Sequence, residues 1–204
     1  MQSLERTKRV IIALHGWTGN INSLKPIAKL WKFPATEWVY IQGPYKENPE
    51  GYSWFEGNNR NGWKYEKSFQ KLNDLIQDLL INGYKHKEMY ILGFSQGACL
   101  AMEFMIRQRF SLGGIIPIAG FIKNKSNFKK DQNILSKNTR VFLLHGNEDD
   151  IICPEESKIA YKLIVELGYR AELHFFSGIH KIPLSANKLI QNILSKDLLI
   201  LSLW

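Results

Sequence analysis

The sequence predicts an α/β fold in which a mostly parallel central sheet carries helices on both faces. Short apolar runs alternate with amphipathic segments along the whole chain, a pattern typical of parallel sheets with crossover helices. Polar or glycine-containing segments follow several of the apolar runs directly. The chain has 204 residues, of which 45% are hydrophobic, so we expect residues 1–204 to form one domain with a sizeable core.

Six apolar runs are expected to be strands because they are short and rich in β-branched or aromatic residues. They are residues 9–14, 38–41, 89–92, 114–119, 141–144 and 172–176. Pro117 fits poorly in the fourth run, since proline cannot donate to a strand ladder.

Five segments have apolar residues at helical spacing and are expected to be helices. They are residues 24–31, 69–80, 98–105, 154–167 and 189–194. Ser23 is expected to cap the first, Asn82-Gly83 to end the second, and Pro154 to occupy the first turn of the fourth.

Three segments fit neither pattern. Residues 45–66 form a long connection rich in glycine, asparagine and aromatic residues, and connections of this length are usually functional. Residues 121–139 are polar and basic, so we expect an excursion with little core. The apolar residues 198–204 are expected to pack on the chain's own core.

The net charge of +8 is expected to reflect a lysine-rich surface, because no nucleic-acid-binding motif accompanies it. Nucleic acid is therefore not expected as a partner, and membrane contact is conceivable but not expected. Two cysteines imply no disulfide framework. The sequence lacks an apolar signal region and any apolar run of about 20 residues, which predicts a cytoplasmic protein.

The clearest motif is Gly93-Phe94-Ser95-Gln96-Gly97, which follows an apolar run and precedes an apolar helix. A serine at such a strand-to-helix turn sits in a strained conformation, and glycines two residues away on each side remove clashing side chains. The helix N-terminus beneath it favours a developing oxyanion. Ser95 is therefore the candidate nucleophile.

A serine nucleophile needs a base, and the base needs a carboxylate that orients it. His180 follows the last predicted strand, and Asp149 follows the strand before it, so both should lie at the same edge of the sheet as Ser95. His145 is the rival base and Asp150 the main rival carboxylate, with Glu148 a weaker one.

Two backbone N–H groups are expected to hold the oxyanion. Gln96, directly after the nucleophile, provides one, and Trp17, in the loop after the first strand, provides the other. His15 is expected to hold that loop in place. This chemistry requires no metal and no cofactor.

Five motifs spread over the chain make it resemble the phospholipase/carboxylesterase family of α/β-hydrolases, which includes the acyl-protein thioesterases. The motifs are Leu14-His15-Gly16, Ser53-Trp54-Phe55-Glu56, Gly93–Ala98, His145–Asp149 and Gly178-Ile179-His180. The resemblance implies an α/β-hydrolase fold, the triad Ser95, Asp149 and His180, and Asp149 rather than Asp150 as its carboxylate.

The resemblance also implies that Trp54 and Phe55 line an acyl or alcohol pocket, with ordinary aromatic core as the alternative. Ile179 is assigned to substrate binding as well. The sequence departs from the family in its first loop, His-Gly-Trp-Thr-Gly, at Glu56, and in the segment after Gly120. These departures affect the walls of the substrate site more than the triad.

The expected function is that of a serine esterase that cleaves small or medium carboxylic esters through an acyl-enzyme. Thioesterase or lysophospholipase activity on long acyl chains is the alternative, and a non-catalytic binding protein of the same fold is a third possibility. The sequence leaves the oligomeric state open.

Overall fold

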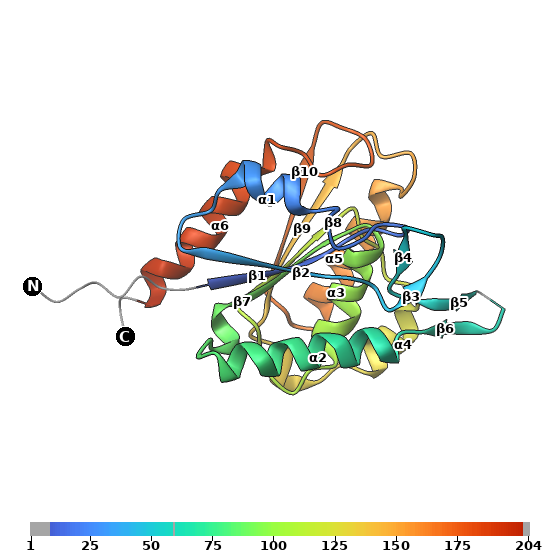
Figure 1. The fold of residues 1–204 in the computed structure, drawn as a ribbon, viewed down its shortest axis with the longest axis horizontal. Coiled ribbons are helices and arrows are strands. Elements are labelled where there is room, and N and C mark those ends of the chain that lie inside the picture. The colour runs from blue at the N-terminus through green and yellow to red at the C-terminus, as the bar shows by residue number, and fades with distance from the viewer. Residues whose placement is uncertain (1–8, 59, 202–204) are drawn as a thin grey trace, which may run out of the picture.

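A six-stranded sheet forms the centre of the computed structural model, which describes residues 9–58 and 60–201, with side chains up to residue 195 (Figure 1). The strand order is β10-β9-β8-β7-β1-β2. Each neighbouring pair is parallel, which confirms the predicted sheet. The strands are β1 (Arg9–Leu14), β2 (Thr36–Ile41), β7 (Met89–Phe94), β8 (Gly114–Ile118), β9 (Arg140–Gly146) and β10 (Ala171–Phe176).

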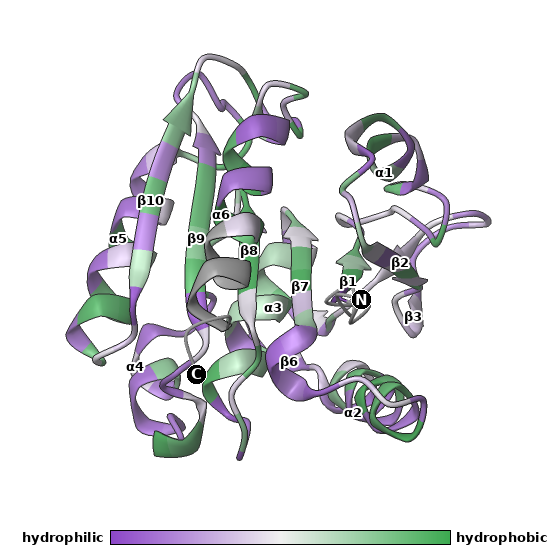
Figure 2. Ribbon diagram, turned by 90° about the vertical axis from the view of Figure 1, so that its left-hand side faces the viewer, coloured by the Kyte–Doolittle hydropathy of each residue, from purple (hydrophilic) through white to green (hydrophobic). Residues whose placement is uncertain are grey.

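Helices cover both faces of the sheet, as predicted (Figures 1 and 2). One face carries α2 (Glu66–Ile81), α3 (Gln96–Ile106), α4 (Lys125–Lys130) and α5 (Pro154–Glu166), and the other carries α1 (Lys25–Trp31) and α6 (Ala186–Leu201). Alternate residues of β1 point to opposite faces: Val10, Ile12 and Leu14 pack in the α2/α3/α5 cluster, whereas Ile11 and Ala13 pack in the α1/α6 cluster. Burial on both faces explains why β1 reads as a continuous apolar run.

The edge strand β10 differs from the central strands. Its residues are partly or fully exposed, and they include Glu172 and His174. Figure 2 shows the resulting mixture of polar and apolar residues along β10, beside the more uniformly apolar β9. Polar side chains on an edge strand discourage pairing with another chain.

Residues 45–66 form two small antiparallel pairs instead of an uninterrupted loop. β3 (Tyr45–Lys46) pairs with β4 (Tyr52–Ser53), and β5 (Glu56–Asn58) pairs with β6 (Gly62–Lys64). Strands of two or three residues are too short for an alternation that the sequence would reveal.

The structure corrects two local predictions and confirms a third. Ser23 does not cap α1, because its Oγ accepts a hydrogen bond from the Asn20 amide and the helix begins one residue after Leu24. Pro117 lies within β8, as the predicted run implies. It is paired with Gly93 of β7, while the register with β9 passes through Ile115 and Ile118 and omits it. The excursion after β8 contributes to the core, since Phe128 in α4 is fully buried.

The structure bears on two further predictions, one about membrane-spanning helices and one about the apolar residues 198–204. Within the part that the structure describes, no helix is long and apolar enough to cross a bilayer. The helix α6 runs to Leu201, but the side chains beyond residue 195 lie outside the described residues. The expected packing of the apolar tail therefore stays a prediction.

The strand order brings the loops after β1 and β7 together. β1 lies between β2 and β7, so the chain leaves β1 toward one side of the sheet and later leaves β7 toward the other. Ligand sites of open parallel sheets form where strand order reverses in this way, at the carboxyl ends of the strands. Ser95 and the Gly16–Gly19 loop lie at this point.

Candidate active site

Ser95 sits at the turn between β7 and α3 in a strained backbone conformation. Its φ of 52° and ψ of −112° lie in a region that non-glycine residues rarely adopt, at a cost of about 1–3 kcal/mol. The Ser95 amide donates to the Ile118 carbonyl of β8 at 2.8 Å, which fixes the turn to the neighbouring strand. The predicted strand–turn–helix geometry around Ser95 is present.

Gly93 and Gly97 leave no room for side chains. A Cβ on Gly93 would collide with the Gly97 carbonyl, and a Cβ on Gly97 would collide with the Leu14 carbonyl and lie 2.6 Å from that of His15. Because neither glycine has a positive φ, the requirement is one of space. The close approach packs the start of α3 against the loop after β1.

Replacing Gly97 with alanine is expected to destabilise the protein by about 1–3 kcal/mol, because the added methyl must displace backbone. It should also impair activity by shifting the loop after β1. Urea denaturation and ester hydrolysis measure the two effects. The comparison variant is Gly83→Ala, where the Cβ meets open space and only a left-handed backbone is strained, so activity should be retained. A Gly97→Ala protein with full activity and wild-type stability would contradict the proposed tight packing.

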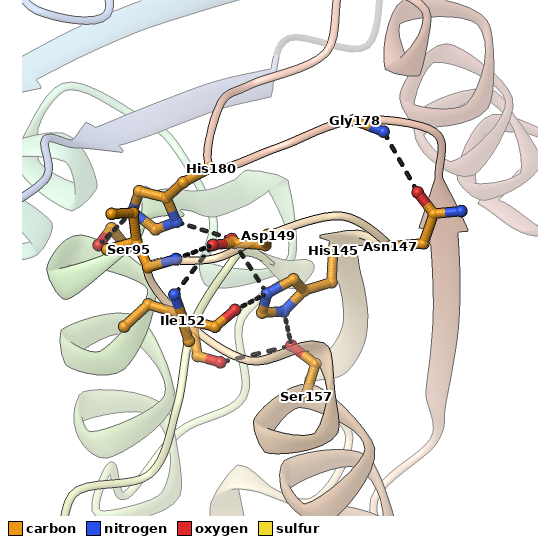
Figure 3. A network of polar contacts seen from close by, with 10 residues as sticks. Ser95, His145, Asn147, Asp149, Ile152, Ser157, Gly178 and His180 are labelled. Atoms are coloured by element: carbon orange, nitrogen blue, oxygen red, sulfur yellow. Dashed lines mark hydrogen bonds and ion pairs between the residues drawn. The ribbon is translucent and has the colours of Figure 1, made fainter.

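Ser95, His180 and Asp149 form a continuous hydrogen-bonded chain (Figure 3). The Ser95 hydroxyl lies 3.0 Å from Nε2 of His180, and Nδ1 of His180 lies 2.7 Å from Oδ2 of Asp149. These distances allow Ser95 to donate to His180 and His180 to donate to Asp149. The structure thus brings together the three residues that the sequence singled out, and it leaves Asp150 exposed.

The Asp149 carboxylate is fully buried and its two oxygens have different partners. Oδ1 accepts from the amides of Ile151 and Ile152 at 3.0 and 2.9 Å, while Oδ2 faces His180. Burial opposes ionisation, but the hydrogen bonds from Ile152, His180 and Ile151 outweigh it, so the pKa of Asp149 lies below its usual value. The carboxylate is therefore charged throughout the neutral range.

A second imidazole contacts the same carboxylate. Nε2 of His145 lies 3.2 Å from Oδ2 of Asp149 and 2.9 Å from the Ile152 carbonyl, and since a carbonyl only accepts, Nε2 must carry the proton. Nδ1 of His145 lies 2.6 Å from the Ser157 hydroxyl of α5. His145 is fully buried behind Asp149 and does not contact Ser95, so its position does not suit the role of base.

The loop that carries His180 is fastened to the loop that carries Asp149 (Figure 3). The Asn147 amide donates to the Phe176 carbonyl at 2.9 Å, and the Glu148 amide donates to the Gly178 carbonyl at 3.0 Å. These backbone bonds continue the pairing of β9 with β10 beyond the strands. The Asn147 side chain adds a third bond, because its Oδ1 accepts from the Gly178 amide at 3.3 Å (Figure 3).

His15 holds the loop after β1, as predicted. The Gly43 amide donates to Nε2 of His15 at 2.9 Å, so Nε2 is unprotonated and Nδ1 donates to the Gly16 carbonyl at 2.7 Å. Burial lowers the pKa of His15, which favours this neutral form. The loop that bears Trp17 is thereby anchored at its first residue.

Trp54 is an interior residue, which corrects the expectation that it lines a substrate pocket. Its side chain is 0% exposed, so it cannot face a water-filled cleft. Its indole N–H donates to the His15 carbonyl at 2.8 Å, and its backbone amide donates to the side chain of Gln96 at 2.8 Å. Trp54 therefore connects the loop after β1 with the turn at Ser95.

A cavity of about 470 Å³ opens beside His180. Its walls include Phe94, Ile27 and Ile182 together with the loop residue Trp17, which is 61% exposed. Neither Phe55 nor Ile179 belongs to its walls. Phe55 instead borders a separate cavity, and Ile179 is 53% exposed. Their assignment to substrate binding stays a prediction.

The model of one protein family, described as phospholipase/carboxylesterase, matches residues 1–198. The chain belongs to the phospholipase/carboxylesterase family. The resemblance drawn from the five motifs is thus confirmed, and the α/β-hydrolase fold is confirmed with it.

Individual proteins that are similar to this chain include a hydrolase and an acyl-protein thioesterase. An uncharacterized hydrolase of Schizosaccharomyces pombe is 28% identical over 135 residues, which cover 59% of this chain and 56% of the relative. Acyl-protein thioesterase 1 of Debaryomyces hansenii is 27% identical over 166 residues, 78% of this chain and 68% of the relative. The crystal structure of Arabidopsis thaliana SOBER1 superposes with a TM-score of 0.83 at 20% identity, over 94% of this chain and 99% of that one.

Several residues around the candidate active site were not identified from the sequence. Ser53 and the side chain of Gln96 form a buried pair in which Gln96 donates to the Ser53 hydroxyl at 2.9 Å. Phe94, inside the motif itself, packs 4.9 Å from the His180 ring. The sequence did contain a signal for Phe94 and for the Gln96 side chain, because both residues flank the candidate nucleophile. Within the described part of the chain, no three His, Cys, Asp or Glu side chains gather as a metal-binding group.

Proposed function

We propose that this hydrolase-family chain is a serine esterase that cleaves small or medium carboxylic esters through an acyl-enzyme. The observation that carries the proposal is the hydrogen-bonded series from Ser95 through His180 to Asp149, at 3.0 and 2.7 Å. A hydroxyl, an imidazole and a buried carboxylate in this order are the groups that activate a serine.

In the proposed mechanism, Ser95 Oγ attacks the acyl carbon while His180 takes its proton. The protonated His180, stabilised by the charge on Asp149, then gives that proton to the leaving alcohol. In deacylation, His180 removes a proton from water as the water oxygen attacks the acyl carbon. The bond between that carbon and Ser95 Oγ then breaks, His180 returns the proton to Ser95 Oγ, and the carboxylic acid is released.

The oxyanion formed in each step is assigned to the backbone N–H groups of Gln96 and Trp17. Gln96 begins α3, so its amide is one of the unpaired donors at a helix N-terminus. The Trp17 loop is held by His15 and by the Trp54 indole. Loss of one such donor typically costs about 10²–10³ in kcat, so this anchoring matters as much as the triad.

Labelling with a fluorophosphonate probe tests the proposal, because the probe reacts only with an activated serine. Covalent modification mapped to Ser95 by peptide mass spectrometry is expected, and it should disappear in His180→Ala, which keeps the hydroxyl and removes the base. An unlabelled wild-type protein would support a non-catalytic binding protein of the same fold.

Thioester substrates are the second candidate, favoured by the similarity to acyl-protein thioesterase 1 of Debaryomyces hansenii. Oxygen esters and thioesters of matched chain length, assayed side by side, separate the two. A steep preference for long acyl thioesters or lysophospholipids would replace the small-ester proposal while keeping the same triad.

A further inference from the structure

A second cavity, of about 480 Å³, lies between the β5–β6 hairpin, α3 and the segment after β8. Phe55, Trp63 and Tyr65 form its aromatic walls, and Lys123, Glu103 and Arg107 are its charged residues. Mixed walls of this kind, apolar with a few placed polar groups, are typical of small-molecule sites.

The Lys123 ammonium is held among three aromatic rings. Its Nζ lies 3.6 Å from the Trp63 ring centroid, 4.8 Å from that of Phe55 and 5.5 Å from that of Phe121. Ring faces attract a cation, but they leave the three N–H donors of an ammonium poorly satisfied. Among the described residues, no carboxylate forms an ion pair with Lys123 and no acceptor takes a hydrogen bond from it.

The other charges at this cavity are already paired. Arg107 donates to the Glu103 carboxylate at 2.6 Å and to Asp131 at 2.9 Å. Lys123 is therefore the cation at this cavity whose N–H groups can donate to a ligand. A ligand cation is disfavoured, because Lys123 itself occupies the aromatic faces that would bind one.

The cavity shares the helix α3 with Ser95. Glu103 in its wall lies two helical turns beyond Ser95, about 12 Å from the nucleophile along the helix axis at 1.5 Å per residue. The Phe55 wall is also tied to the active site, since the adjacent Trp54 amide bonds to Gln96.

We propose that this cavity binds the free carboxylate of a dicarboxylic acid half-ester, with Lys123 as the residue that selects it. The inference rests on the proposed esterase function and names its substrate class. Ser95 would cleave the ester end of the acyl group while the other end, a carboxylate, accepts hydrogen bonds from Lys123. Water adds across the acyl C–O bond, so the products are the free alcohol and the diacid.

Two further observations agree with an anionic ligand. Burial lowers the pKa of Lys123 and outweighs the opposing electrostatic effects of Cys99 and Glu103, and a bound carboxylate would raise this pKa. The net charge of +8 attracts anionic substrates toward the protein.

The test compares the p-nitrophenyl monoester of suberic acid with p-nitrophenyl octanoate, which has the same number of carbons and no terminal charge. Lys123→Met keeps the apolar stem and removes the charge. It is expected to lower kcat/KM for the suberate ester by roughly 10- to 100-fold, the worth of a hydrogen bond to a charged group, and to change that for octanoate by less than about threefold.

The matched control is Lys130→Met, which removes the same charge from an exposed position of α4 outside the cavity walls. It should leave the suberate-to-octanoate ratio near the wild-type value. Equal losses in the two lysine variants, or equal losses on the two substrates in Lys123→Met, would overturn the proposal.

Two further measurements test carboxylate binding separately from ester hydrolysis. Free suberate should inhibit octanoate hydrolysis by the wild type competitively, whether or not Lys123→Met folds, and absence of inhibition counts against the site. Calorimetric titration of Ser95→Ala with suberate reports binding without turnover. Suberate binding in a protein that hydrolyses no ester would refute the esterase and keep the carboxylate site, whereas ester turnover without suberate binding would do the reverse.

Discussion

Ser95→Ala is expected to lower kcat for ester hydrolysis by about 10⁴- to 10⁶-fold, since the nucleophile is lost and only binding and oxyanion contacts remain. The Cβ of alanine occupies the same place as that of serine, so the strained turn with φ of 52° is unchanged and the fold should be retained. Steady-state hydrolysis of p-nitrophenyl esters, with circular dichroism as the check on folding, measures the loss.

Ser177→Ala is the control for Ser95→Ala, because Ser177 also lies in the His180 region but its hydroxyl donates to Glu148 at 3.1 Å. This variant should retain most activity. If Ser95→Ala kept more than a few per cent of wild-type turnover in preparations free of contaminating esterase, another group would have to be the nucleophile.

Asp149→Asn is expected to lower kcat by about 10⁴-fold, the size of effect known for this change in a serine triad. Asparagine can keep its carbonyl oxygen on the Ile151 and Ile152 amides, which now bind Oδ1. Its NH₂ group then faces Nδ1 of His180. That nitrogen must accept, so the proton moves to Nε2, and His180 can no longer take the proton of Ser95.

Asp150→Asn provides the comparison, since the neighbouring carboxylate is exposed and lies outside the network. It should retain activity close to that of the wild type. Measurement of kcat as a function of pH extends the test, because hydroxide attack without a competent base gains on the triad route as pH rises. If Asp149→Asn were fully active, another residue would have to orient His180. The activity of Asp150→Asn would then show whether Asp150 is that residue.

The pKa of Asp149 also links this site to stability. Its folded-state pKa is depressed, so the carboxylate binds protons more weakly in the folded than in the unfolded chain. The stabilisation is complete above the unfolded pKa near 4 and is lost as pH falls through the lower folded value. In Asp149→Asn this part of the acid sensitivity is absent.

Much of the fold was predictable because strands buried on both faces, such as β1, carry an apolar signal in almost every residue. The order of Ser95, Asp149 and His180 was predictable for a related reason, since each lies within four residues of the end of a strand that the sequence revealed. The short pairs β3–β4 and β5–β6 were not, because two or three residues carry no measurable period. Phe128 was missed because one buried aromatic in a lysine-rich segment has no neighbours that share its face.

The role of Trp54 could not be read from the sequence for a different reason. A tryptophan beside an active-site motif can face a ligand or support the backbone, and only the direction of its indole decides between the two. Here that direction is set by the His15 carbonyl, which lies 39 residues earlier. Contacts over such separations depend on the assembled sheet, and local patterns do not encode them.

The position of β1 between β2 and β7 has a consequence during synthesis. Its partner β7 begins about 75 residues after β1 ends, and at roughly 5–20 residues per second a ribosome needs about 4–15 s to make that stretch. Over this interval a largely apolar strand can pair only with β2, and its opposite edge has no native partner. The nascent chain is thus expected to depend on chaperone protection until the segment containing Ser95 emerges.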